Sequence, residues 1–448
     1  MESFNKVFER FYRKCVVLSD SDRAKLIESF HLNVKRLRDG LKEYNDEHDS
    51  NYKLFNKPLL QGSISMETTV QNDNNDFDID ICLIFKEETL DDIGPEAFRN
   101  VITDAISRKL GQFKYSAEKK TSCVRIKYAE GYHVDFSLYK RQEGIFGNAQ
   151  YCISSYEWLE RNPYSINDWF RDEIKYKGKI LRKIIRLSKM FCKSREDWRM
   201  PSGLVQTILC DKYLVSSYEN LYENFYFTMK NIVDSINEYT SVYNPIDGKE
   251  ITYRKSDKEK LKNYKERLAS YLQNIDIYGG DVSLAIGFGE FFNHDFFRTN
   301  TKDSSIHESF NFPVSYRDTE EYIDDKVGDV SISKTFKFNC VVYKNGFNPM
   351  SYESYIDKYE RLPHSYKIVC SLPEDIHETI DIDEVYWKVR NVGRLAEELD
   401  DIRGQILNRG ETIKENSQFY GDHYIECYLV KNDVCVAISR LDILIGEK

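Results

Sequence analysis

Residues 61–85 read QGSISMETTVQNDNNDFDIDICLIF, and this stretch decides the fold that the sequence predicts. The pair Gly62-Ser63 opens a polar connection, and the apolar alternation after it predicts a strand that carries Asp78 and Asp80. Because side chains of a strand alternate between its two faces, both aspartates are expected on one face, with backbones roughly 6–7 Å apart. Two carboxylates at that spacing can close on Mg²⁺, a hard cation that also binds substrate phosphates.

A third carboxylate is expected beside these two. Residues 123–138, CVRIKYAEGYHVDFSL, predict a hairpin that turns near residues 130–131. On its second strand Asp135 lies on the face opposite to the apolar side chains, so it can sit beside Asp78 and Asp80 on a neighbouring strand. Two-metal phosphoryl transfer needs such a set, because one ion lowers the pKa of an attacking 3′-hydroxyl while the other neutralises the leaving pyrophosphate.

An isolated Asp-x-Asp pair is common, and about one such match in ten is functional. The upstream Gly-Ser pair and the later strand with Asp135 sharply raise the probability that this Asp-x-Asp pair is functional. Asp73 and Asp76 lie nearby, and Asp76 has the same strand parity. It is therefore either a support of the metal ligands or a ligand itself, if the register shifts by two residues. The apolar alternation brackets Asp78 and Asp80 best, so we assign the site to them.

The motifs GS-x(14)-DID and HVDFSLY resemble those of the DNA polymerase β-like nucleotidyltransferases. Within that superfamily the chain resembles the bacterial cyclic-oligonucleotide synthases (CD-NTases), because three further segments follow in the family's order: NDWFRDE from Asn167, MPSGLVQTIL from Met200 and NPIDGKEITYRKSDKEKLKNYKERL from Asn244. The resemblance covers roughly residues 1–297. It implies an α+β fold, in which a polymerase β-like nucleotidyltransferase palm is joined by a helical second lobe that closes over the nucleotide.

Between residues 175 and 195 the chain has nine lysines or arginines and no acid, in a sequence of net charge −10. Four of them share one face of the predicted helix: Arg182, Arg186, Lys189 and Lys193. A basic helix face is only exposed to solvent, without a binding role, in about two of three cases. Here the carboxylates imply a triphosphate that needs cationic partners, which reverses the balance. By resemblance, Lys189 is the lysine that contacts phosphate.

Further nucleotide contacts come from the same resemblance. A Pro-Ser-Gly triplet with Ser202 at its centre starts an apolar helix, and free N–H groups at a helix start favour phosphate oxygens. Ser202 can equally be an ordinary helix cap. Ser63, next to Gly62, is expected to approach the triphosphate from the opposite side, and Gln61 is expected to contact the nucleotide. The aromatic residue that stacks on the base cannot be selected from 32 tyrosines.

Four segments are expected along the chain: a nucleotidyltransferase core with N-terminal helices (1–150), a helical lobe that completes the nucleotide pocket (151–297), a linker (298–334) and a β-rich domain (335–448). The last segment alternates with period two and contains an Asn-Gly hairpin signal at Asn345. It therefore predicts a small β-sandwich.

The segments VYWKVRNVG, DIRGQI and YGDHYIECYLVKN resemble the AGS-C sensor domain that is often fused to these synthases. The resemblance implies that this domain recognises a ligand, with a nucleotide as one candidate. Trp387, Arg403 and His423 would then offer a stacking surface, a cation and a titratable donor. In an equally weighted alternative, Trp387 is core and Arg403 pairs with an acid such as Glu426.

The length of 448 residues predicts two or three domains, and 41% hydrophobic residues suffice for ordinary cores. No apolar run is long enough for a membrane span and the start MESFNKVFERFYRK is no signal peptide, so a cytoplasmic protein without a membrane partner is expected. Ten cysteines without CxxC spacing are typical of reduced thiols and not of a zinc site. The acidic balance argues against nonspecific nucleic-acid binding by the whole surface.

The sequence thus predicts a nucleotidyltransferase that uses Mg²⁺, with Mn²⁺ as a substitute, to join NTPs without a template and release pyrophosphate. The resemblance implies a cyclic oligonucleotide messenger of bacterial antiphage signalling (CBASS), which a separate effector reads. One rival is a synthase of linear oligomers, made of deoxynucleotides or started on a protein hydroxyl. Another is a catalytically idle protein that senses nucleotides through its C-terminal domain, and intact Asp78, Asp80 and Asp135 argue against it.

Overall fold

The computed structural model describes residues 3–71, 77–90, 93–111, 117–129, 131–143, 149–297, 320–392, 396, 401–419 and 421–446. Asp73 and Asp76 lie outside these ranges. The chain divides into two compact units: unit 1 comprises Met1–Ser19 and Phe30–Pro313, and unit 2 comprises Asp20–Ser29 and Val314–Lys448. The expected boundary at residue 150, between core and helical lobe, stays a prediction.

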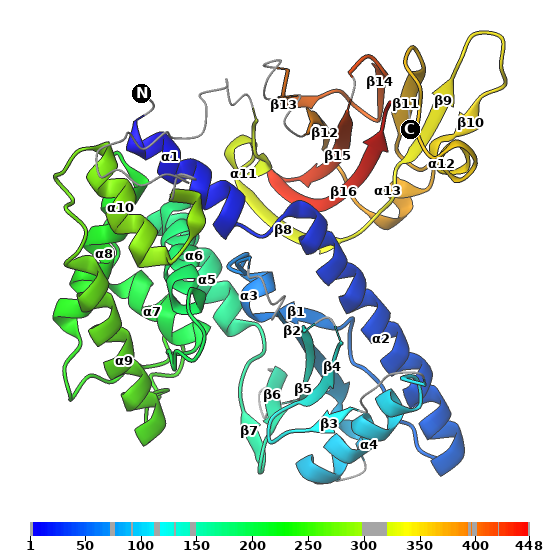
Figure 1. Cartoon of the computed structure of the whole chain (residues 1–448). Helices are drawn as coiled ribbons and strands as arrows, with labels where there is room; N and C mark the ends of the chain where they lie inside the picture. The colour runs from blue at the N-terminus through cyan, green and yellow to red at the C-terminus, as the bar shows by residue number, and fades with distance from the viewer. Residues whose placement is uncertain are drawn as a thin grey trace. The chain divides into compact units, whose positions relative to one another are not determined.

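Unit 1 contains a seven-stranded sheet (Figure 1). Its strands are β1 (Leu59–Gln61), β2 (Asp78–Lys86), β3 (Glu118–Lys119), β4 (Val124–Lys127), β5 (His133–Glu143), β6 (Ala149–Ser154) and β7 (Trp158–Glu160). The order is β1-β2-β5-β4-β3, and β6 pairs with both β5 and β7. Strands β2 and β5 run parallel and the other pairs run antiparallel, so this mixed sheet with its helices has the predicted α+β character.

Helix α4 (Pro95–Ser107) covers one face of this sheet, and α2 (Asp20–His48) packs on α4 through residues that belong to unit 1. Phe98 of α4 meets Phe85 of β2 edge to face, with ring centroids 4.8 Å apart. Gly40 of α2 comes so close to α4 that a Cβ there would lie 1.8 Å from the carbonyl oxygen of Ala105. Because Phe85 and Asp80 differ in strand parity, α4 packs on the face opposite to Asp80.

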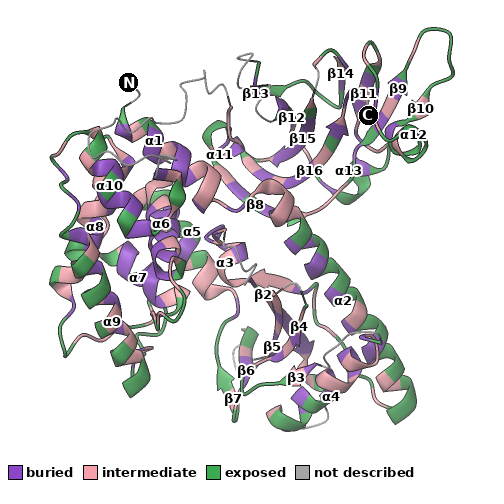
Figure 2. Cartoon of the chain, viewed as in Figure 1, coloured by how far each residue is buried: buried purple, intermediate pink, exposed green. Residues whose placement is uncertain are grey.

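A second group of helices in unit 1 shares one hydrophobic core. It consists of α1 (Phe4–Phe11), α5 (Ser165–Lys177), α6 (Ile180–Lys193), α7 (Gly203–Lys212), α8 (Leu221–Ser235), α9 (Lys255–Leu272) and α10 (Asp281–Phe292). Short helical turns are η1 (Tyr12–Val16), η2 (Glu87–Thr89) and η3 (Asp295–Phe297). The ring of Phe8 lies 4.9 Å from that of Phe288, and many residues of α1 are buried (Figure 2). The N-terminal helix therefore packs with helices that follow residue 150.

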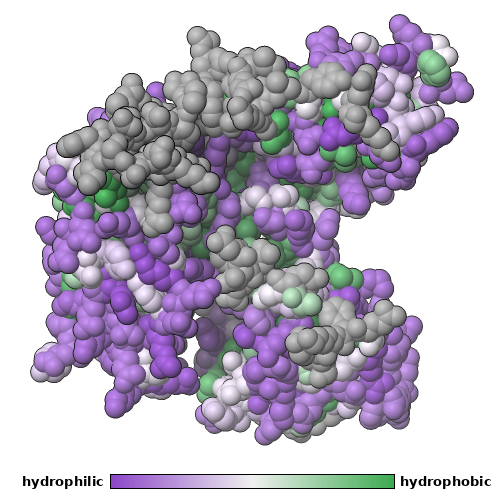
Figure 3. Space-filling view, viewed as in Figure 1, coloured by the Kyte–Doolittle hydropathy of each residue, from purple (hydrophilic) through white to green (hydrophobic). Residues whose placement is uncertain are grey.

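The described surface is largely polar on the face that Figure 3 presents. No helix among the described residues combines the length and the apolar character needed to cross a membrane. All ten cysteines are free thiols, and eight of them are buried. Buried thiols are what the scattered cysteine spacing predicts.

Unit 2 is a β-sandwich, as the period-two alternation predicts. One sheet has the order β10-β9-β11-β14, with β9 (Asn339–Tyr343), β10 (Met350–Ser351), β11 (Lys367–Ser371) and β14 (Thr412–Asn416). The other has the order β13-β12-β15-β16-β8, with β8 (Asp329–Lys334), β12 (Glu384–Asn391), β13 (Arg403–Asn408), β15 (Asp422–Lys431) and β16 (Val434–Leu444). Both sheets contribute to one core, as Ile368 and Ile413 of the first and Ile425 and Leu429 of the second illustrate.

Unit 2 also contains short helices, and its strand β8 comes from the segment predicted to be a linker. The helices are α11 (Ile323–Lys326), α12 (Tyr352–Tyr359) and α13 (Ile376–Thr379). Residues 298–334, for which the sequence predicts a linker, include α11 and strand β8, which pairs in parallel with β16. The alternation there is brief, with only Val330 and Ile332 buried along β8, and so it is a weak signal in the sequence.

Trp387 belongs to the sandwich core and donates its indole N–H to the carbonyl oxygen of Gly410 at 2.7 Å. Arg403 pairs with Glu415 at 3.0 Å, a residue of the other sheet. Glu426, the partner considered from the sequence, accepts a hydrogen bond from the hydroxyl of Tyr428 at 2.6 Å. The core alternative thus holds for the tryptophan, and the arginine does pair with an acid, although with a different one.

Candidate active site

The candidate carboxylates lie on the two parallel strands of the sheet in unit 1. In the ladder between β2 and β5, Asp80 stands directly opposite Asp135, and Asp78 stands opposite His133. Ile79, between the two aspartates of β2, is fully buried, whereas Asp78 is exposed and Asp80 is half-buried. Strand parity therefore brings the three acids to one face, as the alternation predicts.

The three neighbouring carboxylates repel one another, and this repulsion changes the pKa of Asp80. Burial, together with the charges of Asp78 and Asp135, raises the pKa of its carboxyl to about 6, while Arg125 and Lys189 oppose the shift. A carboxylate with a raised pKa among like charges is stabilised by any cation that binds between them. The face therefore favours a positively charged guest.

Arg125 already supplies one positive charge. It stands opposite Asp135 in the ladder between β4 and β5, and its Nε and Nη2 donate to Oδ1 and Oδ2 of that carboxylate at 2.7 and 2.6 Å. Each carboxylate oxygen has a second lone pair, so Asp135 can accept this fork and still bind a metal.

The donor chemistry fits a hard divalent cation, because the ligands on offer are carboxylate oxygens. As the side chains stand, however, the described residues hold no group of three or more His, Cys, Asp or Glu close enough to bind a metal ion. The exposed Asp78 would have to turn toward Asp80 for the set to converge. His133 Nδ1 lies 3.9 Å from one oxygen of Asp78.

Gly62 starts the short helix α3 (Gly62–Ser65) directly against Asp80. The residue before it, Gln61, pairs with Asp80 across β1 and β2. Gly62 has a φ of +67°, and a Cβ at this position would lie 1.9 Å from Oδ2 of Asp80. Only glycine permits this approach, because any side chain would displace the carboxylate. Ser63, the next residue, accepts a hydrogen bond from the hydroxyl of Thr69 at 3.0 Å.

The basic face of α6 is mostly buried against the segment that follows α3. Arg182 Nε donates to the carbonyl oxygen of Met66 at 3.1 Å, and Arg186 Nε donates to that of Glu67 at 2.8 Å. Lys189 Nζ donates to the hydroxyl of Thr68 at 2.8 Å. These cations hold residues 66–68 in place, so the face that the sequence assigned to phosphate has a structural task as well.

Lys189 lies at the junction of several candidate elements. Its Cε is 3.3 Å from the position that a Cβ on Gly203 would take, and Asp80 is near enough to influence its charge. Burial, together with the repulsion of Lys193 and Arg186, lowers the pKa of its ammonium to about 7. An anion bound nearby would raise this pKa again and fix the charge.

Ser202 is the N-cap of α7, and its Oγ accepts a hydrogen bond from the backbone N–H of Val205 at 3.4 Å. The cap interpretation therefore holds, and it leaves the phosphate role of Ser202 a prediction.

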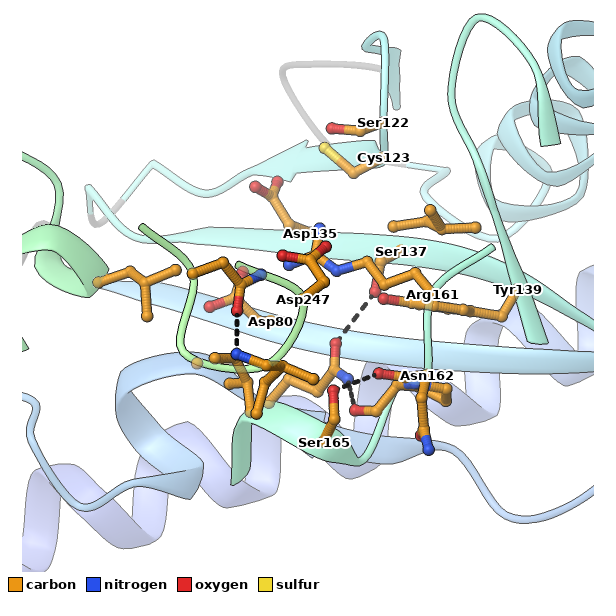
Figure 4. A pocket seen from close by; sticks show the side chains of 18 of the residues that line it. Asp80, Ser122, Cys123, Asp135, Ser137, Tyr139, Arg161, Asn162, Ser165 and Asp247 are labelled. Atoms are coloured by element: carbon orange, nitrogen blue, oxygen red, sulfur yellow. Dashed lines mark hydrogen bonds between the residues drawn. The ribbon is translucent and has the colours of Figure 1, made fainter. Parts of the chain in front are cut away.

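A cavity of about 670 Å³ opens over the carboxylate face. Of the candidate residues, it is lined by Gln61, Gly62, Asp80 and Asp135, whereas Asp78, Ser63, Lys189 and Ser202 are not among its lining residues. Figure 4 shows Asp80 and Asp135 rising from neighbouring strands into this space. The amide of Gln61 donates to the carbonyl oxygen of Pro163 at 2.6 Å and so ties β1 to the cavity wall.

Several lining residues escape the sequence analysis. Arg161 and Asn162 come from the connection after β7, and Asp247 comes from a turn between α8 and α9 (Figure 4). The same turn contributes Asn244 and Lys249. The turn was noted only as a family-like segment, NPIDGKE, without a role. Its charged and amide residues are the feature of the sequence that could have indicated a binding role. A turn has no periodicity, however, so the sequence does not indicate that these residues face the carboxylates.

Two models of known families match the chain. Residues 57–139 match the nucleotidyltransferase domain described as cyclic GMP-AMP synthase DncV-like. Residues 317–446 match the adenylyl/guanylyl and SMODS C-terminal sensor domain, AGS-C. The first segment contains Asp78, Asp80 and Asp135, and the second covers the sandwich of unit 2.

Solved structures of Vibrio cholerae DncV share the fold. The cyclic AMP-GMP synthase aligns with a TM-score of 0.53 at 16% identity, over 65% of this chain and 96% of that one. Its complex with the linear intermediate 5′-pppA(3′,5′)pG aligns with a TM-score of 0.52 at 17% identity, over 65% and 97%. Its complex with nonhydrolyzable GTP gives 0.53 at 18% identity, over 64% and 95%. At these identities the likeness concerns the fold.

Proposed function

We propose that this chain, a CD-NTase with a C-terminal AGS-C domain, joins nucleoside triphosphates without a template into a cyclic oligonucleotide and releases pyrophosphate. The observation that carries the proposal is the direct pairing of Asp80 with Asp135 at the base of a cavity of about 670 Å³. That volume lies within the range of roughly 300–1,000 Å³ that is typical of ligand sites. It is large enough to bring a nucleotide and an acceptor together.

Asp78, Asp80 and Asp135 are the residues that would hold Mg²⁺, or Mn²⁺ in its place. When bound, a divalent cation would neutralise the triphosphate and acidify the attacking 3′-hydroxyl. Support comes from the raised pKa of Asp80, near 6, which reflects burial and two neighbouring carboxylates. Arg125 keeps Asp135 oriented toward the cavity through its two hydrogen bonds.

The triphosphate would be held by residues around α3, α6 and α7. Gly62 and Ser63 lie beside Asp80, and Lys189 lies near both Asp80 and the start of α7 at Ser202. Gln61 borders the cavity and would contact the nucleotide. Lys189 must exchange its hydrogen bond to Thr68 for one to phosphate, or share it, since an ammonium has three donors.

The wider role follows the family. We propose a cytoplasmic enzyme of bacterial antiphage signalling whose product is read by a separate effector, and whose AGS-C domain binds a ligand. A linear product, of deoxynucleotides or started on a protein hydroxyl, is the nearer rival, because ring closure depends on how the intermediate sits in the cavity.

The test incubates the purified chain with four labelled NTPs, and separately with four dNTPs, in Mg²⁺ or Mn²⁺. Products are treated with phosphatase and resolved by mass. The Asp78→Ala/Asp80→Ala variant is compared with Asp39→Ala/Asp46→Ala, which removes two exposed carboxylates of α2 instead.

A phosphatase-resistant ribonucleotide product that only the first variant lacks supports the proposal. A deoxynucleotide ladder, or label fixed to the protein, replaces it with the linear alternative. Retained synthesis by Asp78→Ala/Asp80→Ala refutes the site. Absence of product from every protein, with and without candidate sensor ligands, favours the idle nucleotide-sensing protein.

A further inference from the structure

The core of the sandwich in unit 2 changes from apolar to polar at one end. Along the inner face of β15, Leu429, Cys427 and Ile425 belong to the hydrophobic core, and the next residue on that face is His423. On the neighbouring strand β12, the inner residue at the same level is Asn391, which stands directly opposite His423. Polar side chains at inward positions of a sandwich need a partner, because water cannot reach a packed core.

A cavity of about 310 Å³ occupies this end of the sandwich. Its walls come from both sheets: Asn391, Arg403 and His423 belong to the five-stranded sheet, and Glu415 and Asn416 belong to β14 of the other. The cavity thus lies between the two sheets of the sandwich, and both sheets hold its walls in place. Clefts and cavities of this size are common places for small ligands.

His423 lacks a partner that its position demands. The residue is 7% exposed, and its Nδ1 is buried without a hydrogen-bond partner among the described residues. Burial lowers the pKa of this imidazole to about 4, although the backbone of Gly421 opposes the shift. The ring is therefore neutral near pH 7, and Nδ1 is the ring nitrogen that a ligand could pair with.

Arg403 shows a second sign of a built site. It has a φ of +60°, a backbone region that residues other than glycine rarely adopt. Strain of this kind persists where the surrounding structure requires it, and it is common at ligand sites. From this position its Nη2 reaches Glu415 on the opposite sheet at 3.0 Å, so the pair spans the cavity wall.

The charges of the cavity indicate what it can bind. Among the residues that the structure describes, the charged lining consists of Asp401, Arg403 and Glu415. Glu415 pairs with Arg403 and also with Arg409, so this arginine is already engaged, and Asp401 adds a negative charge beside the pair. An additional phosphate would meet repulsion there. The remaining polar lining consists of amides and the neutral imidazole, which match the donor and acceptor edges of a neutral heterocycle.

Phe419 supplies a flat apolar surface in the same wall. Bases stack on aromatic side chains with a gain of roughly 1–3 kcal/mol each in single-strand binding proteins. We propose that this cavity binds a nucleobase or nucleoside without phosphate, with the base against Phe419 and one of its polar edges on His423. The inference rests on the ligand-binding role proposed for the AGS-C domain, and it names the site and the ligand class.

Calorimetric titration of the full chain with the four ribonucleosides and their 5′-monophosphates tests the inference. At least one nucleoside is expected to bind at least tenfold more tightly than its monophosphate. His423→Gln should weaken that binding at least tenfold, because its amide does not reach the position of Nδ1. His423→Asn, whose amide does, should retain most of it. His377→Gln is the matched control, since His377 is an exposed histidine of the same unit.

A second variant keeps the test decisive if changes at His423 impair folding. Asp401→Asn removes the negative charge of this lining residue and should bring the affinity for the monophosphate closer to that for the nucleoside. Failure of every nucleoside to bind overturns the inference. So does a monophosphate that binds more tightly than its nucleoside, or equal affinity for His423→Gln and His377→Gln. Because binding is measured without synthesis, Asp78→Ala/Asp80→Ala should bind the nucleoside normally, which separates this result from the catalytic proposal.

Discussion

Replacement of Gly62 by alanine tests the geometry of the candidate active site most directly. The added Cβ would lie 1.9 Å from Oδ2 of Asp80, whereas such contacts need about 3.4 Å. The carboxylate must therefore move by more than 1 Å or rotate away from Asp135. A misplacement of about 1 Å at a reacting group costs roughly a hundredfold in rate, so Gly62→Ala should lose at least that much synthesis.

The backbone strain of this substitution can be separated from the displacement of Asp80. Gly410 has a φ of +66°, almost equal to the +67° of Gly62, and no atom lies within 4 Å of the position of its Cβ. Alanine in the left-handed region costs about 1–2 kcal/mol at either site. Gly410→Ala should thus lower the free energy of unfolding by about as much as Gly62→Ala does. Its rate of synthesis should stay within about twofold of wild type.

The assay measures initial rates of product formation by mass, together with urea unfolding of both variants. Near-normal synthesis by Gly62→Ala would show that Asp80 need not keep its position, and it would refute the assigned role. An equal loss in Gly410→Ala would mean that backbone strain, and not the carboxylate, controls the activity.

Four further predictions concern charge. Asp80 must be ionised to bind a cation, so synthesis should rise with pH through about 6, the pKa to which burial raises it, and a flat profile between pH 5 and 7 would contradict this. The folded state holds the proton of Asp80 more tightly than the unfolded chain does, so the free energy of unfolding falls as pH rises from about 4 to 6. At pH 7.5 Asp80→Asn should therefore have a free energy of unfolding up to about 3 kcal/mol higher than wild type, measured in urea, and it should make no product. Arg186→Met leaves the carbonyl oxygen of Glu67 and the hydroxyl of Tyr12 without their donor, and should cost about 2–4 kcal/mol in urea unfolding, whereas the exposed Lys193→Met on the same helix should cost less than about 0.5 kcal/mol. Lys189→Met removes the ammonium proposed to bind phosphate and should raise the KM for NTP at least tenfold, and an unchanged KM would remove Lys189 from the phosphate site. Because burial already disfavours this charge, lowering its pKa to about 7, the loss of its hydrogen bond to Thr68 should change the midpoint of unfolding little.

Local patterns predicted the parts of the fold whose information lies within a few residues. Alternation in β2 and β5 placed Asp80 and Asp135 on the same face, and their strands proved to be neighbours. The period-two pattern after residue 335 predicted a sandwich, and Ile425 and Leu429 lie in its core. These assignments succeed because the pleat of a strand fixes the direction of each side chain, whatever the rest of the chain does.

The sequence by itself thus determined which residue types share a face: the acids of β2 and β5, the basic side chains of α6 and the inward residues of the sandwich. Only the tertiary structure decided what each face meets. It set Arg125 on Asp135, turned Arg182 and Arg186 onto residues 66–68, and placed Arg403 on Glu415. The physical reason is that periodicity encodes direction along one element, whereas a partner from a distant element is chosen by how the layers pack, and no local pattern records that choice.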